Sequence, residues 1–344
     1  MKTKILCLLT AVIILFSACA YNNSKVTQNP IDASDTVTFH FIDVGQGDCT
    51  LILSEDASLL IDAGTAECGG EICRYLKNLG IDYIDLFIGT HPHEDHLGGA
   101  SAVLSSVDVG AVFLNGEGSD SYYYERFVDT LLENRITPLI PEMDCIYEFG
   151  KIRLKFLSPV KDFGNTNDNS LVAKVTYGDI SALFMGDAER SVEAELIKGG
   201  KNISCDILKA GHHGSRYASS LEFLTYADPD ICVIQSGKGN SYGHPHSEAI
   251  ERIEMSGAQI LRNDKLSDVI LSTDGKNIYN ASGDKVDVQK TEMYFEKVYT
   301  GNKKSRVFHC ETCPNLPSEK NSINFKTRDE AINSGYKPCG NCNP

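Results

Sequence analysis

One short stretch constrains this chain more than any other: Gly89-Thr90-His91-Pro92-His93-Glu94-Asp95-His96-Leu97-Gly98-Gly99. It follows an apolar run, residues 84–88, that is predicted to be a buried strand. Pro92 disfavours a helical backbone at His91, so His91 and His93 are expected on extended backbone with their side chains on the same side. Three of the nine histidines fall within six residues here, which argues against a chance polar loop.

Two pairs of metal-capable side chains stand within this stretch, His91 with His93 and Asp95 with His96. Asp95 and His96 lie at the predicted start of a helix, whereas the first pair lies on extended backbone. The spacing also differs from that of helical zinc proteases, whose two histidines are separated by one helical turn. The stretch therefore predicts two adjacent cation sites.

The rest of the chain predicts a mixed α/β protein. Apolar and alternating segments predict strands at residues 37–43, 50–53, 59–61, 109–114, 152–157, 171–177, 183–185, 207–209, 231–235, 260–262 and 269–271. Helices are predicted at 71–79, 98–104, 124–133, 191–197 and 247–255, the last with Ser247 as its N-cap. This order fits an αββα sandwich, two mixed sheets with helices outside. Each candidate ligand follows a strand, so all of them can gather along one edge.

A further candidate ligand, Asp187, follows an apolar strand through a tight turn at Gly186. A carboxylate at a strand end beside a glycine is well placed to bridge two cations. The alternative is that Asp187 caps the helix predicted at 191–197.

These features resemble one known family. The spacing from His91 to His96 resembles the HxHxDH signature of the metallo-β-lactamase fold superfamily. Further segments narrow the resemblance to the soluble hydrolase domain of the competence protein ComEC and its free-standing relatives, over about residues 36–275. These segments are Phe41-Ile42-Asp43-Val44-Gly45-Gln46-Gly47-Asp48, Leu60-Ile61-Asp62-Ala63-Gly64, Asn167-Asp168-Asn169-Ser170-Leu171, Phe184-Met185-Gly186-Asp187, Lys209-Ala210-Gly211-His212-His213-Gly214-Ser215 and Tyr242-Gly243-His244-Pro245-His246.

The resemblance implies a dinuclear site for Zn²⁺ or Mn²⁺ that activates water for attack on a phosphorus or carbonyl centre. The implied candidate ligands are His91, His93, Asp95, His96, Asp187, His212, His213 and His244. The implied catalytic residues are Asp95, His213 and His244. His212, His213 and His244 compete for two roles, last metal ligand and proton donor to the leaving group.

Three further residues are implied around the metals. Asp62 is expected to orient ligands by hydrogen bonds without binding metal, although a strand-ending Asp before Gly is also a common turn residue. Many relatives in the wider superfamily carry another histidine near position 169. This chain has Asn169 and Ser170 there, as ComEC-like sequences do.

The charge of the chain is unevenly divided. The formal net charge is −15, but residues 290–344 carry nine Lys and Arg against six Asp and Glu, a net of +3, which leaves −18 for residues 1–289. An acidic catalytic part disfavours broad electrostatic adhesion to a polyanion. The basic end is therefore the part expected to contact phosphate.

The N-terminal residues 1–19 predict an export signal, with Lys2 and Lys4 before an apolar core that is too short to span a bilayer. Phe16-Ser17-Ala18-Cys19 resembles a bacterial lipobox with Cys19 as the lipidated residue, followed by a flexible tether at residues 20–35. The alternative is ordinary cleavage after Ala18-Cys19-Ala20. The lipobox predicts a protein anchored by lipid to the outer face of the cell membrane.

A separate module is predicted at residues 299–344, after a hydrolase domain at 36–285. Its His309, Cys313, Cys339 and Cys342 resemble the zinc-binding module of Ada-type DNA repair proteins, with His309 where that module has its first cysteine. A zinc ion with one nitrogen and three sulfur ligands would stabilise so small a unit. A four-sulfur set that uses Cys310, or two disulfides in an exported protein, are the alternatives.

Together these features predict a surface-anchored dinuclear metallohydrolase that cleaves phosphodiesters, with DNA as the expected substrate. One alternative substrate is a small or cell-wall phosphodiester such as a phosphorylcholine ester, and another is a lactone or β-lactam. A DNA-binding surface lipoprotein with an inert hydrolase domain is the non-enzyme alternative, which the complete ligand series disfavours.

Replacing Cys19 with Ser is expected to release the protein from the membrane fraction or to leave its leader uncleaved, because the lipid attaches to this thiol. Stable anchoring takes two acyl chains, which lipoprotein modification supplies. Membrane fractionation and mass spectrometry of the mature N-terminus measure the effect, with Cys7→Ser in the apolar core as the control. Unchanged attachment with normal processing would contradict the lipobox interpretation.

Overall fold

The fold was taken from a computed structural model that describes residues 35–288, 299–309, 313, 315–325 and 328–340. Two seven-stranded sheets form its centre. Sheet A has the order β14-β13-β1-β2-β3-β4-β5. Its strands are β1 (Val37–Phe41), β2 (Thr50–Leu53), β3 (Ser58–Ile61), β4 (Tyr83–Gly89), β5 (Asp108–Leu114), β13 (Val269–Thr273) and β14 (Ile278–Asn280).

Sheet B contains the strands that carry the later candidate ligands, in the order β12-β11-β10-β9-β8-β7-β6. Its strands are β6 (Ile146–Phe149), β7 (Ile152–Ser158), β8 (Val172–Tyr177), β9 (Ile180–Phe184), β10 (Ile207–Lys209), β11 (Ile231–Ile234) and β12 (Gln259–Arg262).

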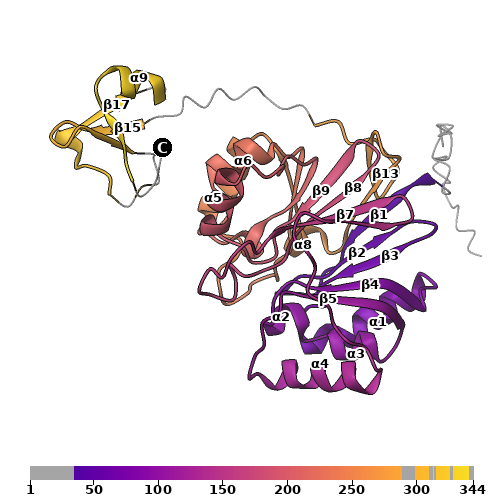
Figure 1. The fold of residues 1–344 in the computed structure, drawn as a ribbon. Helices are drawn as coiled ribbons and strands as arrows, with labels where there is room; N and C mark the ends of the chain where they lie inside the picture. Colours follow the sequence, from indigo (N-terminus) through magenta and orange to yellow (C-terminus); the bar gives the residue numbers. More distant parts are fainter. Residues whose placement is uncertain (1–34, 289–298, 310–312, 314, 326–327, 341–344) are drawn as a thin grey trace, which may run out of the picture.

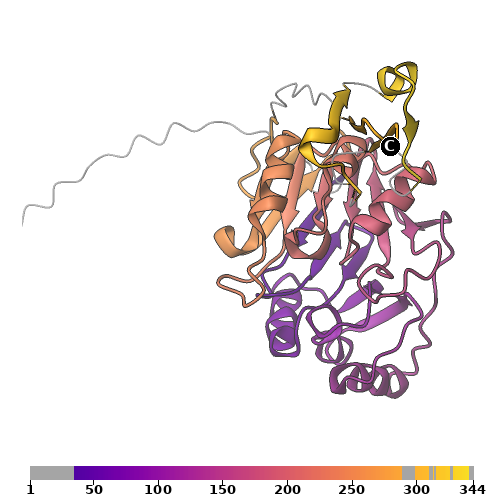
Figure 2. The same ribbon diagram turned by 90° about the vertical axis from the view of Figure 1, so that its left-hand side faces the viewer.

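Helices cover the outer face of each sheet. Against sheet A, α1 (Gly69–Asn78), α3 (Ala100–Leu104) and α4 (Tyr122–Glu133) bury one apolar cluster. Against sheet B, α5 (Arg190–Lys198), α6 (Leu221–Ala227) and α7 (Ser247–Met255) bury another. In the view turned by 90°, the purple helices again lie on the side of sheet A away from sheet B (Figure 2). The short elements η2 (Ala66–Cys68), α2 (Glu94–Leu97), η3 (Gly211–Gly214) and α8 (Asn263–Leu266) lie in the connections.

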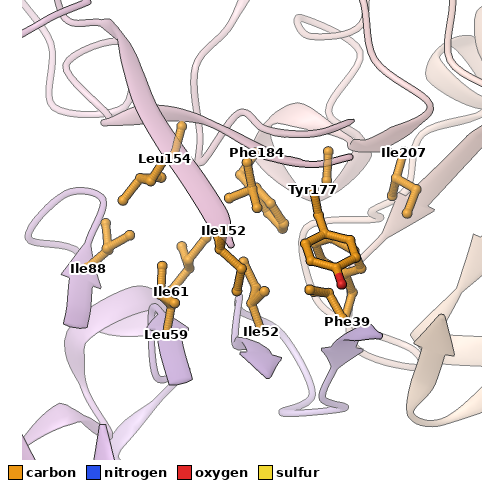
Figure 3. Packing of buried hydrophobic residues seen from close by; sticks show 14 of the residues in the cluster. Phe39, Ile52, Leu59, Ile61, Ile88, Ile152, Leu154, Tyr177, Phe184 and Ile207 are labelled. Atoms are coloured by element: carbon orange, nitrogen blue, oxygen red, sulfur yellow. The ribbon is translucent and has the colours of Figure 1, made fainter. Parts of the chain in front are cut away.

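The main core lies between the two sheets. Figure 3 shows Phe39, Ile52 and Ile61 of sheet A pointing toward Ile152 and Phe184 of sheet B. Alternate residues of each strand supply this layer, as expected for sheets that are packed face to face. The order of helices, sheet, sheet and helices confirms the predicted αββα sandwich (Figure 1).

Strand direction determines where the functional residues meet. In sheet A, β3, β4 and β5 are parallel, and in sheet B, β9, β10, β11 and β12 are parallel. Parallel neighbours end at the same edge, and the segments that follow them carry chemistry in many α/β folds. Here Asp62 follows β3, the His91–His96 loop follows β4, Asp187 follows β9, and His212 follows β10.

Several details differ from the sequence-based predictions. The helix predicted at 98–104 begins at Ala100 as α3, and Gly98 and Gly99 separate it from the short α2. A Cβ on Gly99 would lie 2.2 Å from the carbonyl oxygen of Ala63, so glycine allows the close packing there. Ser247 is the first residue of α7, and the extended His246 before it is the N-cap. Strands β6 and β14 and helix α6 were not predicted, because each is short and has no long periodic pattern.

The C-terminal residues form a small unit of their own. Its sheet has the order β17-β15-β16-β18 and consists of β15 (Tyr299–Asn302), β16 (Val307–His309), β17 (Ser322–Phe325) and β18 (Lys337–Pro338), accompanied by η4 (Glu319–Asn321) and α9 (Arg328–Asn333). Only Phe308, Phe325, Ala331 and Tyr336 form its buried apolar cluster among the described residues. A core of this size is marginal without a metal or another covalent constraint.

The predicted leader with Cys19, and nearly all of the predicted tether, lie outside the described residues. Among the helices of the described ranges, none combines the length and the apolar character that crossing a bilayer requires.

Candidate metal centre

In the loop after β4, His93 is extended as predicted, with φ −78° and ψ 154°, and α2 begins at the next residue. The turn between β1 and β2 contacts this loop, where the Asp48 amide donates a hydrogen bond to the Asp95 carbonyl at 3.1 Å. A Cβ on Gly47 would lie 2.4 Å from that same carbonyl oxygen, so only glycine allows this close approach.

The first cluster contains His91, His93, His212 and one carboxylate oxygen of Asp187. The Nε2 atom of His91 lies 3.0 Å from Nδ1 of His93 and 3.7 Å from Oδ2 of Asp187. His212 approaches the same oxygen, with its Nε2 atom 3.6 Å from Asp187 Oδ2. Two imidazoles therefore face one carboxylate oxygen, and His93 lies next to the first of them.

The second cluster contains Asp95, His96, His213 and the other oxygen of Asp187. Asp187 Oδ1 lies 3.2 Å from Nε2 of His96 and 3.5 Å from Nε2 of His213. Asp95 Oδ2 lies 3.2 Å from Nε2 of His213, and Asp95 Oδ1 lies 4.0 Å from Nε2 of His96. The two oxygens of Asp187 thus face two different sets of nitrogens.

The donor atoms of the second cluster fit a cation. His96 Nε2, His213 Nε2 and Asp187 Oδ1 are buried, and none of them has a hydrogen-bond partner. Buried polar atoms without partners are rare, and converging nitrogen and carboxylate atoms are typical ligands of Zn²⁺ and Mn²⁺. The arrangement can therefore hold a divalent cation at each side of Asp187.

Neighbouring groups fix three of the imidazoles by their Nδ1 atoms. Asp62 Oδ2 lies 2.8 Å from Nδ1 of His96, and Glu189 Oε1 lies 2.8 Å from Nδ1 of His212. The Gln235 carbonyl lies 3.1 Å from Nδ1 of His213. With Nδ1 protonated and donating, Nε2 is left free to bind a metal.

Ser170 and Asn169 have different positions. Ser170 Oγ lies 3.2 Å from Nδ1 of His91 and accepts a 3.1 Å hydrogen bond from the Asp187 amide, so it contacts both clusters. The Asn169 side chain instead donates to Glu117 and Asp162. Ser170 therefore lies against the candidate ligands, whereas Asn169 supports the adjoining loop.

Asp48 also lies beside the second cluster, but on its outer side. Its Oδ1 atom is 3.1 Å from Nδ1 of His213, and its Oδ2 atom is 3.9 Å from Nδ1 of His96. Asp95 faces the Nε2 atoms of both rings, so Asp95 is the better ligand candidate. Asp48 forms a buried ion pair with Lys209 instead.

The protonation states follow from this crowding of charges. Burial alone lowers the pKa of His213, but Asp187 and Asp48 outweigh it and raise that pKa to about 10. Burial also lowers the pKa of His96, but Asp187 and Asp62 outweigh it and raise that pKa well above its usual value. Burial would raise the pKa of Asp187, yet His213 and His96 hold it well below its ordinary range. Without metal, two imidazolium groups therefore supply the positive charge of the second cluster.

His244 lies at the border of both clusters. Its ring centroid is 5.3 Å from that of His212 and 6.1 Å from that of His213, and Tyr242 stacks on it at 5.9 Å. Within the described chain it is within 4 Å of no carboxylate oxygen, unlike His212 and His213. Burial, then His213 and His212, lower the pKa of His244 to about 4. The ring is therefore neutral near pH 7 in the metal-free protein.

Sequence reasoning missed four residues of this site: Asp48, Glu189, Lys209 and Gln235. Lys209 gave a signal, because it is a charged residue within a short apolar strand, which suggests a buried partner. Asp48 ends a Gly-rich turn and could be taken for a turn residue. Gln235 holds His213 through its backbone carbonyl, and the residue type gives no signal for that contact.

Asp187 is not the N-cap of α5, because that position belongs to Glu189, whose backbone is extended. The alternative role considered for Asp187 is therefore wrong.

A separate metal-capable cluster lies in the C-terminal unit. His309 Nδ1 is 3.2 Å from the Cys313 sulfur, which is 3.9 Å from the Cys339 sulfur. At that separation the two sulfurs are not bonded to each other, and three converging donors fit a tetrahedral zinc site. Cys342, the fourth predicted ligand, and Cys310 lie outside the described residues.

Comparison with known proteins agrees with both units. Residues 42–237 match the Metallo-beta-lactamase superfamily, and residues 287–344 match the Metal binding domain of Ada. The chain is 28% identical over 243 residues to ComE operon protein 3 of Bacillus subtilis, which covers 65% of this chain and 31% of that protein. It is 30% identical over 258 residues to Competence protein ComA of Neisseria gonorrhoeae (74% and 34% covered). It is also 30% identical over 218 residues to Recombination protein 2 of Haemophilus influenzae (62% and 26% covered). The chain thus spans roughly a third of the length of these relatives.

Metal binding is expected to release about two protons, because His96 and His213 carry raised pKa values and must lose their protons to bind a cation. The apparent affinity should therefore fall as the pH is lowered from 8 to 6. Calorimetry in buffers of different ionisation enthalpy measures the number of protons released. A binding enthalpy that does not depend on the buffer, with an affinity that does not depend on pH, would contradict this charge assignment.

Proposed function

Because this chain belongs to the metallo-β-lactamase superfamily, we propose that it is a dinuclear metal-dependent hydrolase of phosphodiesters and that its substrate is DNA. The observation that carries the proposal is the position of Asp187 between two sets of ligands. One of its oxygens faces His91 and His212, and the other faces His96 and His213. A carboxylate in this position is suited to bridging two cations.

His212 supports two-site occupancy. The first cluster has Ser170 in the region where many superfamily members carry another histidine, so it needs a further nitrogen ligand. His212 Nε2 lies 3.6 Å from Asp187 Oδ2, and its Nδ1 is held by Glu189. We assign His212 to the first cation and His213 to the second.

Two bound divalent cations would supply Lewis-acid activation of a phosphodiester and a nucleophilic water at neutral pH. The chain itself supplies the orientation: Asp62, Gln235 and Glu189 hold the ligand imidazoles by their Nδ1 atoms. His244, which the two clusters leave without a carboxylate partner, is assigned to the substrate. Its neutral ring can donate a hydrogen bond to a phosphoryl or leaving-group oxygen.

The choice of DNA rests on the relatives and on charge. Two relatives are named for competence and for recombination, which are processes of DNA. The net charge of +3 after residue 289 gives the C-terminal unit a favourable interaction with phosphate, whereas residues 1–289 carry −18. We propose that the acidic hydrolase domain performs the chemistry and that the C-terminal unit, with zinc bound, holds the nucleic acid.

We also propose that the protein works at the outer face of the cell membrane, anchored through lipid on Cys19. A catalytic domain on a tether could then act on extracellular DNA. The Cys19→Ser variant tests this location independently of the chemistry.

Asp187→Ala is expected to remove at least one of two bound cations and to reduce turnover to background, because both clusters lose a carboxylate oxygen. Mn²⁺ or Zn²⁺ content by mass spectrometry and hydrolysis of bis(p-nitrophenyl) phosphate, single-stranded DNA and plasmid measure this. Asp206→Ala is the matched control. The Asp206 carboxylate accepts hydrogen bonds from Ser181 at the ends of the strands that lie opposite the metal-capable clusters. Retained metal and activity in Asp187→Ala would remove the bridging role.

Wild-type activity on small esters but never on DNA would replace the nuclease assignment with the cell-wall phosphodiester alternative. Activity on lactones or β-lactams alone would exclude phosphodiester chemistry.

Deleting residues 299–344 is expected to leave turnover of the small phosphodiester nearly intact and to raise the apparent KM for long DNA. The salt dependence of DNA binding should also decrease, by about 0.9 in the slope of log K against log salt for each phosphate that the shortened protein no longer neutralises. Steady-state kinetics and binding titrations at several salt concentrations measure both effects. Loss of activity on both substrates would show that this unit is part of the hydrolase fold, and unchanged DNA kinetics would remove its DNA-binding role.

A further inference from the structure

The side chain of Lys209 is buried next to the second cluster. The Lys209 side chain is 2% exposed, and its ammonium pairs with the carboxylate of Asp48, which is 5% exposed. Lys209 Nζ also donates to the Gly186 carbonyl at 3.1 Å. Burying an ammonium is costly unless it is fully paired, so a lysine at this position calls for a specific explanation.

The Lys209–Asp48 pair contacts three segments that supply ligands to the second cluster. Lys209 binds the Gly186 carbonyl, which belongs to the turn that presents Asp187. The Asp48 carboxylate lies 3.1 Å from Nδ1 of His213, and the Asp48 amide donates to the Asp95 carbonyl at 3.1 Å.

Among the described residues, the first cluster is linked to this pair through fewer contacts: the Gly186 carbonyl also accepts the His212 amide at 3.0 Å, and Asp187 is shared by both clusters. Nδ1 of His91 is held by Thr90 and Ser170, and Nδ1 of His212 is held by Glu189. The pair therefore contacts more ligand-bearing residues of the second cluster, His213 and Asp95 besides the shared Asp187 turn, than of the first.

We propose that Lys209 and Asp48 are positioning residues that set the geometry of the second cation site, joining the loop after β4, the turn after β9 and the segment after β10. The ammonium gives the Asp48 carboxylate a fixed partner, so that Asp48 stays beside Nδ1 of His213, next to the Gln235 carbonyl that holds this ring, and does not compete with Asp95 as a ligand. Lys209 also holds the turn that presents Asp187, through its hydrogen bond to the Gly186 carbonyl.

This inference rests on the proposed dinuclear site, and the experiment separates the two. Zn²⁺ titration calorimetry of the full-length wild-type protein should show two cations in the hydrolase domain besides the one expected in the C-terminal unit. Lys209→Met should lower the affinity of one hydrolase cation by about 10- to 100-fold, the usual effect of removing a residue that orients a metal ligand. It should lower the affinity of the other cation by a clearly smaller factor, because that cation shares only the Asp187 turn with the pair. The visible spectrum of bound Co²⁺ should change more for the cation of the second cluster than for the other.

Lys174→Met is the matched control, because Lys174 also donates to backbone carbonyls, at Asn202 and Ser204, away from the ligands. It should change neither affinity. The double variant Asp48→Asn/Lys209→Met removes both buried charges and should recover the thermal stability that Lys209→Met alone lacks, while the affinity of the second cation stays at least about tenfold low.

Recovery of that affinity together with stability would overturn the positioning role and leave an ordinary buried ion pair. An equal loss at both hydrolase cations in Lys209→Met would also overturn it. If Lys209→Met does not fold, the double variant alone decides between these results. If the wild-type protein binds no cation in the hydrolase domain, the proposed function fails. If the wild-type protein binds two cations there and Lys209→Met binds both with unchanged affinity, only the positioning role of Lys209 and Asp48 fails.

Discussion

Several carboxylates lie together at one buried edge of the sandwich, and the arrangement of the site depends on the positive charge that neutralises them. Asp48, Asp62 and Asp187 are almost completely buried, and Asp95 is partly buried beside them. Carboxylates so close together cannot all remain ionised without positive charge among them. In the metal-free protein Lys209 and the protonated His96 and His213 supply it. Divalent cations at the same place would take over the role of the two imidazolium groups.

The two sheets make this concentration of charge possible. Sheet A delivers the loop after β4, and sheet B delivers Asp187 and the histidines after β10, so the clusters exist only when the sheets are packed together. The apolar layer between the sheets therefore stabilises the site indirectly. Gln235 adds a direct link, because its side-chain amide donates to the carbonyls of Ile42 and Cys49 while its own carbonyl holds His213.

A short backbone turn explains how two consecutive residues serve two different clusters. His212 and His213 both have positive φ, 45° and 53°, a conformation that costs free energy for a residue with a Cβ. The turn directs Nε2 of His212 to one oxygen of Asp187 and Nε2 of His213 to the other. Packing of the surrounding chain, including Gly214 against Pro245, holds the turn in place.

The sequence by itself determined the fold class and most of the candidate ligands. The αββα order followed from hydrophobic periodicity, and the His91–His96 loop was identifiable because its metal-capable residues lie within six positions of one another. Asp187 was also identifiable, since the position of a carboxylate at a strand end is a local property. The exact start of α7 was missed, because local propensity distinguishes poorly between a cap and a first residue.

Only the tertiary structure separated the three later histidines and revealed Asp48 with Lys209. Whether His212, His213 or His244 faces Asp187 depends on a turn with positive φ, which the residue types His-His do not predict. The pairing of Asp48 with Lys209 joins the turn after β1 to the end of β10, and no local pattern relates two residues so far apart in sequence. The candidate ligands followed from local chemistry, whereas long-range packing fixes which nitrogen each ring turns toward the clusters.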